Sequence, residues 1–485
     1  MRRLLSFGVV AVWLVLMALL VRKHATEEPA PSTPLPTGEI AARDEWFGVY
    51  RAGRKIGHAH RTVAHTADGY TFREDSVVAL AMLGVPQTLE SALRADTDAA
   101  YALRAFDFTL VTPATTFVAN GTSDDHVLRA RYGPRGHEAP LELPLQAPIA
   151  LPSTLRPRVL ADAPKAGARY TLPVFSPLTA RSEPMTIEVE GRERLATSRG
   201  PVDTLRIAEE HQGMRTHAWL DDDGNVVREE AVLGFTLERE PREVALGGVD
   251  ARAPVDLVAV SAIPVEGAID DPRAAARLTL RVGGNAAASI PNDPPRQEHT
   301  ADLVRIVREP LPATAPAPDT TPGEGAAGAL AAEPFIESDD PAIVAQARAI
   351  AADATDPRVV ARRLVTWVHD NLEKAPSVTV PSAKEVLEAR RGDCNEHSVL
   401  LAALARAARI PARVIAGAVY ANDGFYYHAW NELWLGGWVS ADAVFDQLPV
   451  DATHVKLIEG GLERQVALAG IIGQLTFAVV EETPR

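Results

Sequence analysis

Hydrophobic and polar residues alternate in short runs through residues 39–310 of the chain. Residues 46–50 and 55–59 form one predicted hairpin, and residues 214–220 and 226–229 form another around an acidic, glycine-containing turn. Turns recur about every ten residues, a spacing that is typical of all-β folds. The pattern predicts an antiparallel sheet or an open barrel in this region.

Beyond residue 333 the hydrophobic period changes to that of helices. Asp340-Pro341 and Asp356-Pro357 each offer an N-cap followed by proline at the first helical position, so a helix is predicted to begin at each. Ser382 and Glu385 have the spacing of a capping box and predict a third, shorter helix. The pattern then returns to strands, which are predicted at residues 413–420, 425–435 and 438–440.

An apolar run at residues 4–21 lies between Arg2-Arg3 and Arg22-Lys23. A helix of this length spans about 27 Å, close to the hydrocarbon thickness of a bilayer. A cleaved signal peptide would have a shorter apolar core and small residues at its cleavage site. We therefore predict an uncleaved, single-pass anchor in the inner membrane of a Gram-negative bacterium, with the bulk of the chain in the periplasm; cleavage stays open.

Two low-complexity segments divide the rest of the chain. One is rich in proline and threonine and predicts an extended tether, and the other is rich in proline, alanine and glycine and predicts a linker. The predicted fold class is α+β, with an antiparallel β-rich domain and a transmembrane helix before the C-terminal domain. The predicted parts are an anchor at 4–21, the tether at 25–38, a β-rich region at 39–310, the linker at 311–333 and an α+β domain at 334–485.

Composition narrows the possible chemistry. The formal net charge of −15, with no basic stripe that carries aromatic residues, argues against a nucleic-acid partner. Cys394 is the single cysteine of the chain, so neither an intramolecular disulfide nor a cysteine-rich zinc site can form. A lone cysteine is usually a small buried apolar residue. Its neighbours therefore decide whether it has a chemical role.

Cys394 follows Gly392-Asp393 and precedes an apolar helical face at residues 399–407. At the start of a helix, free N–H groups and the helix dipole lower the pKa of a thiol and can bind an oxyanion. His428 lies on the predicted middle strand, and Asp442 closes the next one. A cysteine on a helix that faces a histidine and an aspartate on strands predicts a nucleophile, its general base and an orienting carboxylate.

The loop between the last two predicted strands decides whether His428 and Asp442 can meet. Side chains alternate along a strand, so a two-residue loop at Gly436-Gly437 would place them on opposite faces of the sheet. A three-residue loop at 435–437 pairs Trp430 with Asp442 and makes His428 and Asp442 diagonal neighbours on one face. We predict the three-residue loop or an equivalent bulge.

Residues 382–457 resemble the core of the bacterial transglutaminase-like superfamily. The resemblance implies a papain-like core with Cys394 as nucleophile, His428 as base and Asp442 as the residue that orients it. The implied reaction is acyl transfer from a protein or peptide amide, through a thioester, to water or to an amine; we predict no cofactor and no bound metal. The motifs that carry the resemblance are Gly-Asp-Cys at 392–394, Ile-Pro-Ala-Arg at 410–413, His-Ala-Trp at 428–430, Gly-Trp-Val at 437–439 and Asp442.

The third member of this predicted triad has two reserve candidates. The family usually has Asp-Pro where this chain has Asp442-Ala443. Asp446 and Asp451 follow shortly after and could orient the histidine instead.

Other interpretations also stay open. His397 could join Cys394, His428 and Asp442 in a zinc site, although a surface histidine is the simpler interpretation. A second His-Ala-Trp at 217–219 lies far from the cysteine in sequence, and we assign no chemistry to it. The alternative to an enzyme is a non-catalytic, transglutaminase-like binding or scaffold protein at the cell envelope.

Overall fold

The computed structural model describes most of the chain from residue 39 onward. The anchor and tether predicted at 4–21 and 25–38 lie outside the described residues. No helix in the described part of the chain is long and apolar enough to cross a membrane. The described residues are 39–484 except 83, 114, 157, 158, 160–163, 178–180, 212, 213, 250–253, 316–325, 334, 376–381, 461–467 and 472.

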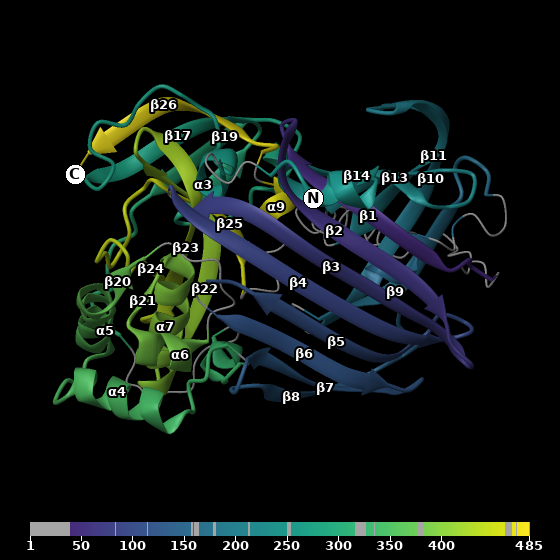
Figure 1. Cartoon of the computed structure of the whole chain (residues 1–485). Coiled ribbons are helices and arrows are strands. Elements are labelled where there is room, and N and C mark those ends of the chain that lie inside the picture. The colour runs from purple at the N-terminus through teal and green to yellow at the C-terminus, as the bar shows by residue number, and fades with distance from the viewer. Residues whose placement is uncertain are drawn as a thin grey trace, which may run out of the picture.

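A large antiparallel sheet contains most of the residues before 241, and it confirms both predicted hairpins (Figure 1). The chain forms one meander from β1 to β8 and another from β9 to β14, and the pairing of β1 with β14 joins the two. The strands are β1 (Arg43–Arg51), β2 (Arg54–His65), β3 (Gly69–Met82), β4 (Val85–Asp98), β5 (Leu103–Val111), β6 (Thr116–Ser123), β7 (Val127–Pro134), β8 (Ala139–Pro144), β9 (Arg169–Ser176), β10 (Arg181–Thr197), β11 (Gly200–His211), β12 (Met214–Leu220), β13 (Val226–Glu230) and β14 (Phe235–Glu240).

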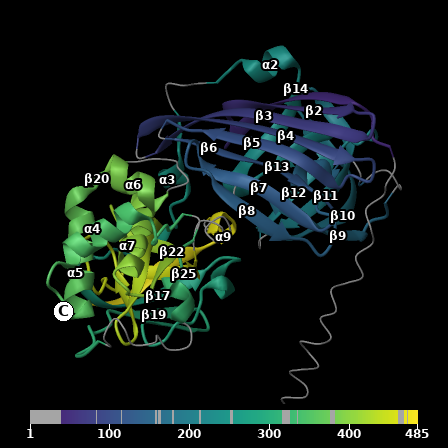
Figure 2. The same ribbon diagram turned by 90° about the horizontal axis from the view of Figure 1, so that it is seen from below.

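The two meanders curve toward a shared interior, as the view from below shows (Figure 2). Leu80 of β3 and Val174 of β9 belong to one buried apolar cluster, although the strands lie far apart in the order of the sheet. Phe106 of β5 packs on Phe175 of β9 with ring centroids 5.2 Å apart. The interior is therefore filled by side chains from both meanders.

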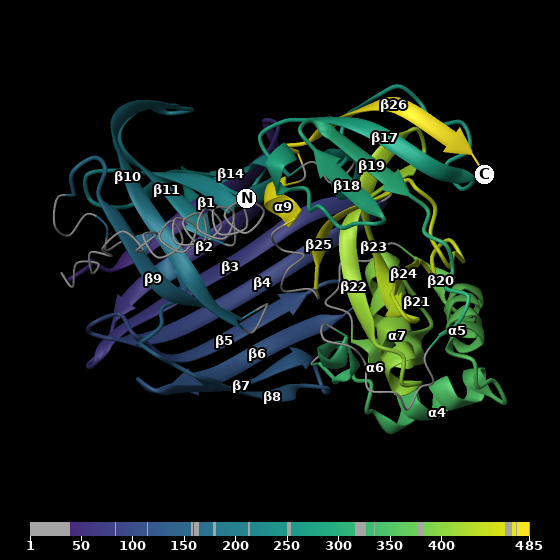
Figure 3. The ribbon, with the colours of Figure 1, turned by 180° about the vertical axis from the view of Figure 1, so that it is seen from behind.

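A second, five-stranded sheet combines residues from both sides of the segment predicted as a linker. β26 (Thr476–Pro484), at the carboxyl end of the described chain, pairs with β17 (Ala275–Gly283). Figure 3 shows these strands close to the C-terminus and above the helical part of the molecule. The other strands are β16 (Val265–Glu266), β18 (Gln297–Thr300) and β19 (Leu303–Val307).

The C-terminal part packs helices against a four-stranded antiparallel sheet of order β24-β23-β22-β25. Asp340 and Asp356 cap α4 and α5 as predicted, each with its side chain accepting a backbone N–H. The elements are α4 (Pro341–Ala351), α5 (Pro357–Asn371), α6 (Ala383–Ala389), α7 (Cys394–Ala407), β22 (Ala412–Ala421), β23 (Gly424–Trp434), β24 (Trp438–Ala441) and β25 (His454–Glu459).

Short elements complete the described chain. These are η1 (Pro152–Thr154), η3 (Val232–Gly234), α2 (Arg242–Leu246), β15 (Val255–Asp256), α3 (Leu257–Val260), η4 (Ala287–Ser289), η5 (Ala327–Leu330), β20 (Glu373–Lys374), β21 (Arg391–Gly392) and α9 (Leu468–Ile471).

The capping box predicted at the start of α6 is wrong. Ser382 is the N-cap of this helix, but its hydroxyl donates a hydrogen bond to Glu337 and caps no backbone N–H of the helix. The capping box of this region belongs instead to α7, where Asp393 and Glu396 bind each other's backbone N–H groups. Glu337 comes from a distant part of the sequence, which is why the local pattern misassigned the serine.

The predicted α+β fold class is also wrong for the chain as a whole. Strands make up 52% of the structure and helices 17%, so the protein is mostly β, with large antiparallel sheets. The longest helices, α4, α5 and α7, lie in the C-terminal half, whereas long strands such as β10 fill the first half. The prediction underestimated the share of strands because the length of each strand is set by pairing with partners that lie far away in the sequence.

Candidate active site

Cys394 is the first residue of α7, and the residues around it hold the helix start in a fixed shape. The Asp393 side chain accepts the N–H of Asn395 at 2.8 Å, and the Glu396 side chain accepts the N–H of Asp393 at 2.8 Å. A Cβ atom on Gly392 would lie 2.3 Å from the Cβ of Glu396. Only glycine leaves room for this capping box, which sets the position of the cysteine.

The Cys394 thiol lies against the backbone of β23. The residue is half-buried, and the backbone N–H of Ala429, the residue after His428, favours its thiolate form. β24 pairs with β23 only over residues 431–434, so the edge of β23 at residue 429 is free of that strand. The helix start and the histidine-bearing part of β23 therefore meet at this edge.

The electrostatic surroundings of the thiol differ from the prediction. Burial raises the pKa of Cys394 well above its usual range, and the nearby Asp393 carboxyl adds to the rise, while the Ala429 N–H opposes it. The prediction of a thiol pKa lowered by the helix start is therefore wrong. The cysteine rests as a neutral thiol and needs a base to become a nucleophile.

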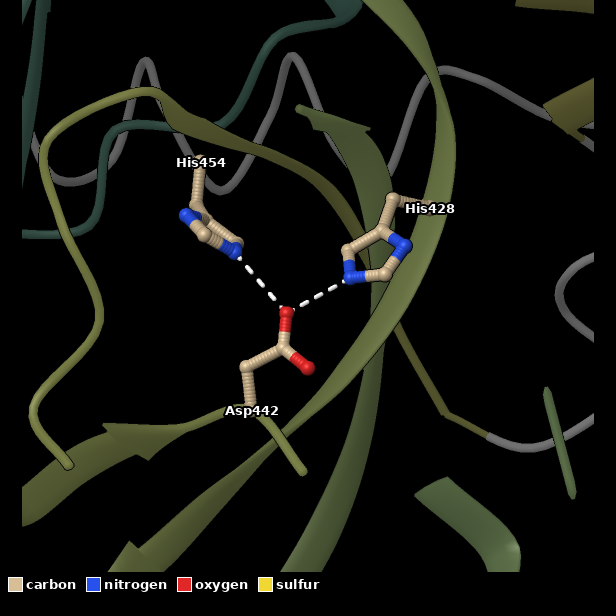
Figure 4. A group of neighbouring side chains, drawn as sticks. All are labelled: His428, Asp442 and His454. Carbon is tan, nitrogen blue, oxygen red and sulfur yellow. Dashed lines mark hydrogen bonds and ion pairs between the residues drawn. The ribbon is translucent and has the colours of Figure 1, made fainter. Parts of the chain in front are cut away.

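The loop between β23 and β24 has the predicted three residues, because Trp434 pairs with Trp438 and Asn431 with Ala441. This register brings His428 and Asp442 to one face of the sheet, where His428 Nε2 lies 2.6 Å from Asp442 Oδ2 (Figure 4). The histidine side chain is 7% exposed and the aspartate side chain 1%. The structure therefore forms the predicted pair, and both side chains are almost fully buried.

Asp442 is ionised in this site. Burial alone would raise its pKa, but the neighbouring histidines His428 and His454 hold the pKa of this carboxyl well below its usual range. Its second oxygen, Oδ1, accepts the N–H of Val444 at 2.6 Å. An ionised carboxylate only accepts hydrogen bonds, so the proton on His428 is on Nε2, and Nδ1, which Figure 4 shows turned away from Asp442, can accept a proton.

The two reserve aspartates contact other partners. Asp446 forms an ion pair with Arg362 and accepts a hydrogen bond from Thr366 at 3.0 Å. Asp451 binds His454, which in turn binds Asp442. Asp442 is therefore the carboxylate that contacts His428 directly.

His454 is a site residue that the sequence analysis missed. It is fully buried, and its Nε2 lies 3.0 Å from the same Asp442 oxygen that binds His428. It begins β25, and the pairing of that strand with β22 brings it to the site. The sequence signal was weak: a lone histidine three residues after Asp451.

Aromatic rings enclose the two histidines. Trp430 lies parallel to His428 at a centroid distance of 6.2 Å and edge-on to His454 at 5.2 Å. Phe445 approaches His428 at 5.3 Å, and the Arg273 guanidinium lies over the Phe445 ring at 4.3 Å. These rings exclude water and strengthen the interactions between the charged groups of the site.

His397 is not a surface histidine. Its side chain is buried, its Nδ1 lies 2.7 Å from the carbonyl oxygen of Asp393, and burial lowers its pKa. A carbonyl oxygen only accepts, so Nδ1 carries the proton and the ring is the neutral form. It supports the capped start of α7.

The residues with converging possible metal ligands, within the described part of the chain, are His428, Asp442 and His454. The 2.6 Å between Nε2 of His428 and Oδ2 of Asp442 is a hydrogen-bond length. Two ligands of a tetrahedral zinc ion lie about 3.3 Å apart. The present arrangement is therefore a chain of hydrogen bonds, and the zinc set proposed with Cys394 and His397 is not the group that converges.

Comparison with known families finds a match for part of the C-terminal half of the chain. Residues 344–443 match the Transglutaminase-like superfamily and so include Cys394, His428 and Asp442. The match ends before Asp451 and His454. No curated protein sequence matches the chain.

Solved structures show only distant likenesses. A protein of Cytophaga hutchinsonii, provisionally named a cysteine protease, is 18% identical with a TM-score of 0.29, over 43% of this chain and 87% of its own. A β-barrel-like protein of Brucella abortus, of a domain family of unknown function, is 14% identical with a TM-score of 0.31, over 42% and 96%. A provisionally named protease of Parabacteroides distasonis is 11% identical with a TM-score of 0.21, over 75% and 65%. Similarity at this level carries no argument about activity.

Proposed function

We propose that this protein is a cysteine-dependent acyltransferase or hydrolase of protein or peptide amides, with Cys394 as nucleophile, His428 as base and Asp442 as its orienting carboxylate. The observation that carries the proposal is the buried hydrogen bond between His428 and Asp442, beside the Ala429 N–H that favours the Cys394 thiolate. The match of residues 344–443 to the Transglutaminase-like superfamily supports the same assignment.

In the proposed first step, the Cys394 sulfur bonds to the amide carbonyl carbon while Nδ1 of His428 takes the thiol proton. The carbonyl π electrons move to oxygen. The backbone N–H of Cys394, at the first position of α7, has no acceptor within the helix and can bind this oxyanion. Asp442 stabilises the imidazolium that forms on His428.

In the second step the carbon–nitrogen bond breaks, and the amine leaves with the proton from His428. The acyl group stays on Cys394 as a thioester. Water then resolves the thioester in an amidase or peptidase, and an amine resolves it in a transglutaminase. His428 removes the proton of the incoming nucleophile in both cases, so the same three residues serve both outcomes.

The raised pKa of Cys394 makes the reactivity of the thiol depend on His428. A cysteine with a lowered pKa would react with alkylating agents without help from a base. Here burial disfavours the thiolate, which is formed only as the proton passes to the imidazole. Chemical labelling can therefore measure the proposed function without a known substrate.

The test is the rate of iodoacetamide alkylation of the folded full-length protein near neutral pH, followed by intact mass. Because the chain has one cysteine, a single added group reports on Cys394 alone. We expect fast labelling that His428→Gln slows strongly and that the matched substitution His217→Gln leaves unchanged. Acyl-enzyme trapping on Cys394, with mass identification of the acyl group, then identifies the substrate.

The contrary result has a definite form. If the thiol reacts only after the protein is unfolded, or if His428→Gln does not change the rate in a folded protein, then Cys394 is a structural residue. The transglutaminase-like binding or scaffold protein would then be the correct interpretation.

A further inference from the structure

His454 lies between two carboxylates at the centre of the site. Its Nε2 is 3.0 Å from Asp442 Oδ2, and its Nδ1 is 3.1 Å from Asp451 Oδ1. Its side chain is 0% exposed, and its contact with Asp442 is drawn in Figure 4. The segment that matches the family, residues 344–443, ends before both Asp451 and His454.

The hydrogen bonds of His454 determine its charge. Burial would raise the pKa values of both acceptors, Asp442 and Asp451, but contacts with His454 itself, together with His428 and Arg273, hold these pKa values below the usual range, so both are ionised. An ionised carboxylate cannot donate, so both nitrogens of His454 must carry a proton. The ring is then an imidazolium, enclosed by an acid on each side.

Other charged groups around His454 are compatible with a cation there. Arg273 forms an ion pair with Asp451 at 2.9 Å and so shares that carboxylate. Arg296 donates to the backbone carbonyl of His454 at 3.4 Å and is itself paired with Glu309. His428 approaches with a ring centroid 5.7 Å away. Lys456, two residues along β25, is paired with Glu432 at 3.1 Å.

We propose that His454 is a positioning residue: a protonated imidazole that, held by Asp451, fixes the Asp442 carboxylate against His428 and shares its negative charge. Two consequences follow. Oδ2 of Asp442 stays directed at Nε2 of His428, so Nδ1 stays turned away from that carboxylate. The shared charge also limits how strongly Asp442 stabilises a protonated His428.

The charge on His454 can be measured without any catalytic activity. In wild-type protein with ¹⁵N-labelled histidine, long-range ¹H–¹⁵N spectra distinguish a ring with two protonated nitrogens from a neutral one. We expect His454, assigned by its loss in His454→Gln, to be doubly protonated near neutral pH. A neutral His454 would overturn the inference and leave the proposed function intact.

The kinetic test rests on the proposed function and uses the pH dependence of Cys394 alkylation. In His454→Gln the cation is absent and the full charge of Asp442 acts on His428. The acid limb of the pH profile of alkylation should therefore move up by about one pH unit. The rate at its optimum should fall by about tenfold to a hundredfold, part of what a general base contributes. A role in packing alone would lower the rate without moving the acid limb.

Asp451→Asn provides a second variant in case His454→Gln does not fold. The amide still accepts the Nδ1–H of His454 but no longer stabilises its charge, so the same upward shift is expected, with a smaller loss of rate. His217→Gln is the control for replacing a histidine elsewhere. An unmoved acid limb in both folded variants would overturn the inference.

Two further outcomes separate this inference from its alternatives. If one equivalent of zinc binds and shifts the signals of His428 and His454 together, the three residues form a metal site and the inference is wrong. If wild-type Cys394 does not react at any pH while His454 is doubly protonated, the proposed function fails and the charge assignment stands.

Discussion

The same tripeptide, His-Ala-Trp, occurs on two antiparallel strands of this protein: at 217–219 on β12 and at 428–430 on β23. In both places the alanine and the tryptophan are buried. In both places the histidine also binds a carboxylate, Glu230 in the first copy and Asp442 in the second. Only the second copy lies next to the proposed nucleophile, so neither the tripeptide nor a histidine–carboxylate contact is sufficient to define a site.

Solvent makes the first difference between the copies. The side chains of His217 and Glu230 are 20% and 46% exposed, whereas those of His428 and Asp442 are 7% and 1% exposed. Water screens the first pair, and such exposed pairs contribute little energy. The second pair is held where each charge acts strongly on its neighbours. Burial, more than residue type, therefore makes the pair of His428 and Asp442 suited to proton transfer.

The second difference is what completes each cluster. His217 also approaches Glu190 at 3.6 Å, so it lies among surface acids. His428 is next in sequence to Ala429, whose N–H favours the Cys394 thiolate, and its carboxylate is shared with a second, fully buried histidine. Substitutions made in matched pairs, one in each copy, can test this distinction directly.

The largest effect is expected from His428→Gln against His217→Gln. The first removes the proposed base and should lower acyl transfer and Cys394 alkylation by about 10³- to 10⁴-fold. The second should change neither by more than about twofold, because its ring contacts no group of the site. Steady-state rates and alkylation kinetics measure both. Equal effects of the two variants would remove the distinction between the copies.

A somewhat smaller effect is expected from Asp442→Asn against Glu230→Gln. The amide at 442 can no longer stabilise an imidazolium on His428, and loss of such a carboxylate lowers kcat by up to about 10⁴-fold. KM should change much less, because the carboxylate does not contact the substrate. Glu230→Gln should leave kcat within about twofold. A loss confined to KM in Asp442→Asn would contradict the proposed role.

The pH dependence of stability should also distinguish the buried site around the second copy from the exposed surroundings of the first. The pKa of His454 is raised: burial opposes the charge, but Asp451 and Asp442 stabilise it more strongly. The contribution of His454 to the free energy of unfolding is therefore present below its unfolded pKa of 6.5 and is lost as pH rises through its folded pKa. Asp442, with a lowered pKa, acts oppositely: its contribution is present above the unfolded value of 3.8 and is lost as pH falls through the folded pKa.

Urea unfolding of His454→Gln near pH 6 and pH 9 measures the histidine's part. We expect the loss of free energy of unfolding, relative to wild type, to be greater near pH 6 by about 1 kcal/mol. Glu230→Gln should cost less than about 0.5 kcal/mol at either pH because its side chain is partly exposed. A loss that grows toward high pH would contradict the assigned charge of His454.

The smallest effect concerns the two tryptophans. The indole N–H of Trp219 donates to Glu193, whereas that of Trp430 has no hydrogen-bond partner in the described part of the chain. A double-mutant cycle of Trp219→Phe with Glu193→Ala should give a coupling energy of about 1 kcal/mol in urea unfolding. A coupling near zero would show that both tryptophans act only through their apolar rings.

Local patterns of the sequence were sufficient for several parts of the fold. The Asp-Pro pairs located the starts of α4 and α5, because a cap and a fixed φ act within one turn. The two β hairpins depended on turns a few residues long. Cys394 at the start of α7, and the shared face of His428 and Asp442, also depended on short-range geometry: a helix start and the parity of one three-residue loop.

Long-range contacts decided the rest. The pairing of β1 with β14 joins residues almost two hundred positions apart, so the extent of the β structure, and with it the fold class, could not be read from local periodicity. The thiol pKa is raised because tertiary packing buries the helix start that by itself would lower it. His454 reaches Asp442 only through the pairing of β25 with β22. The sequence by itself thus determined which groups could react, and the tertiary structure decided their charges, because charge depends on burial and on neighbours that the chain brings from far away.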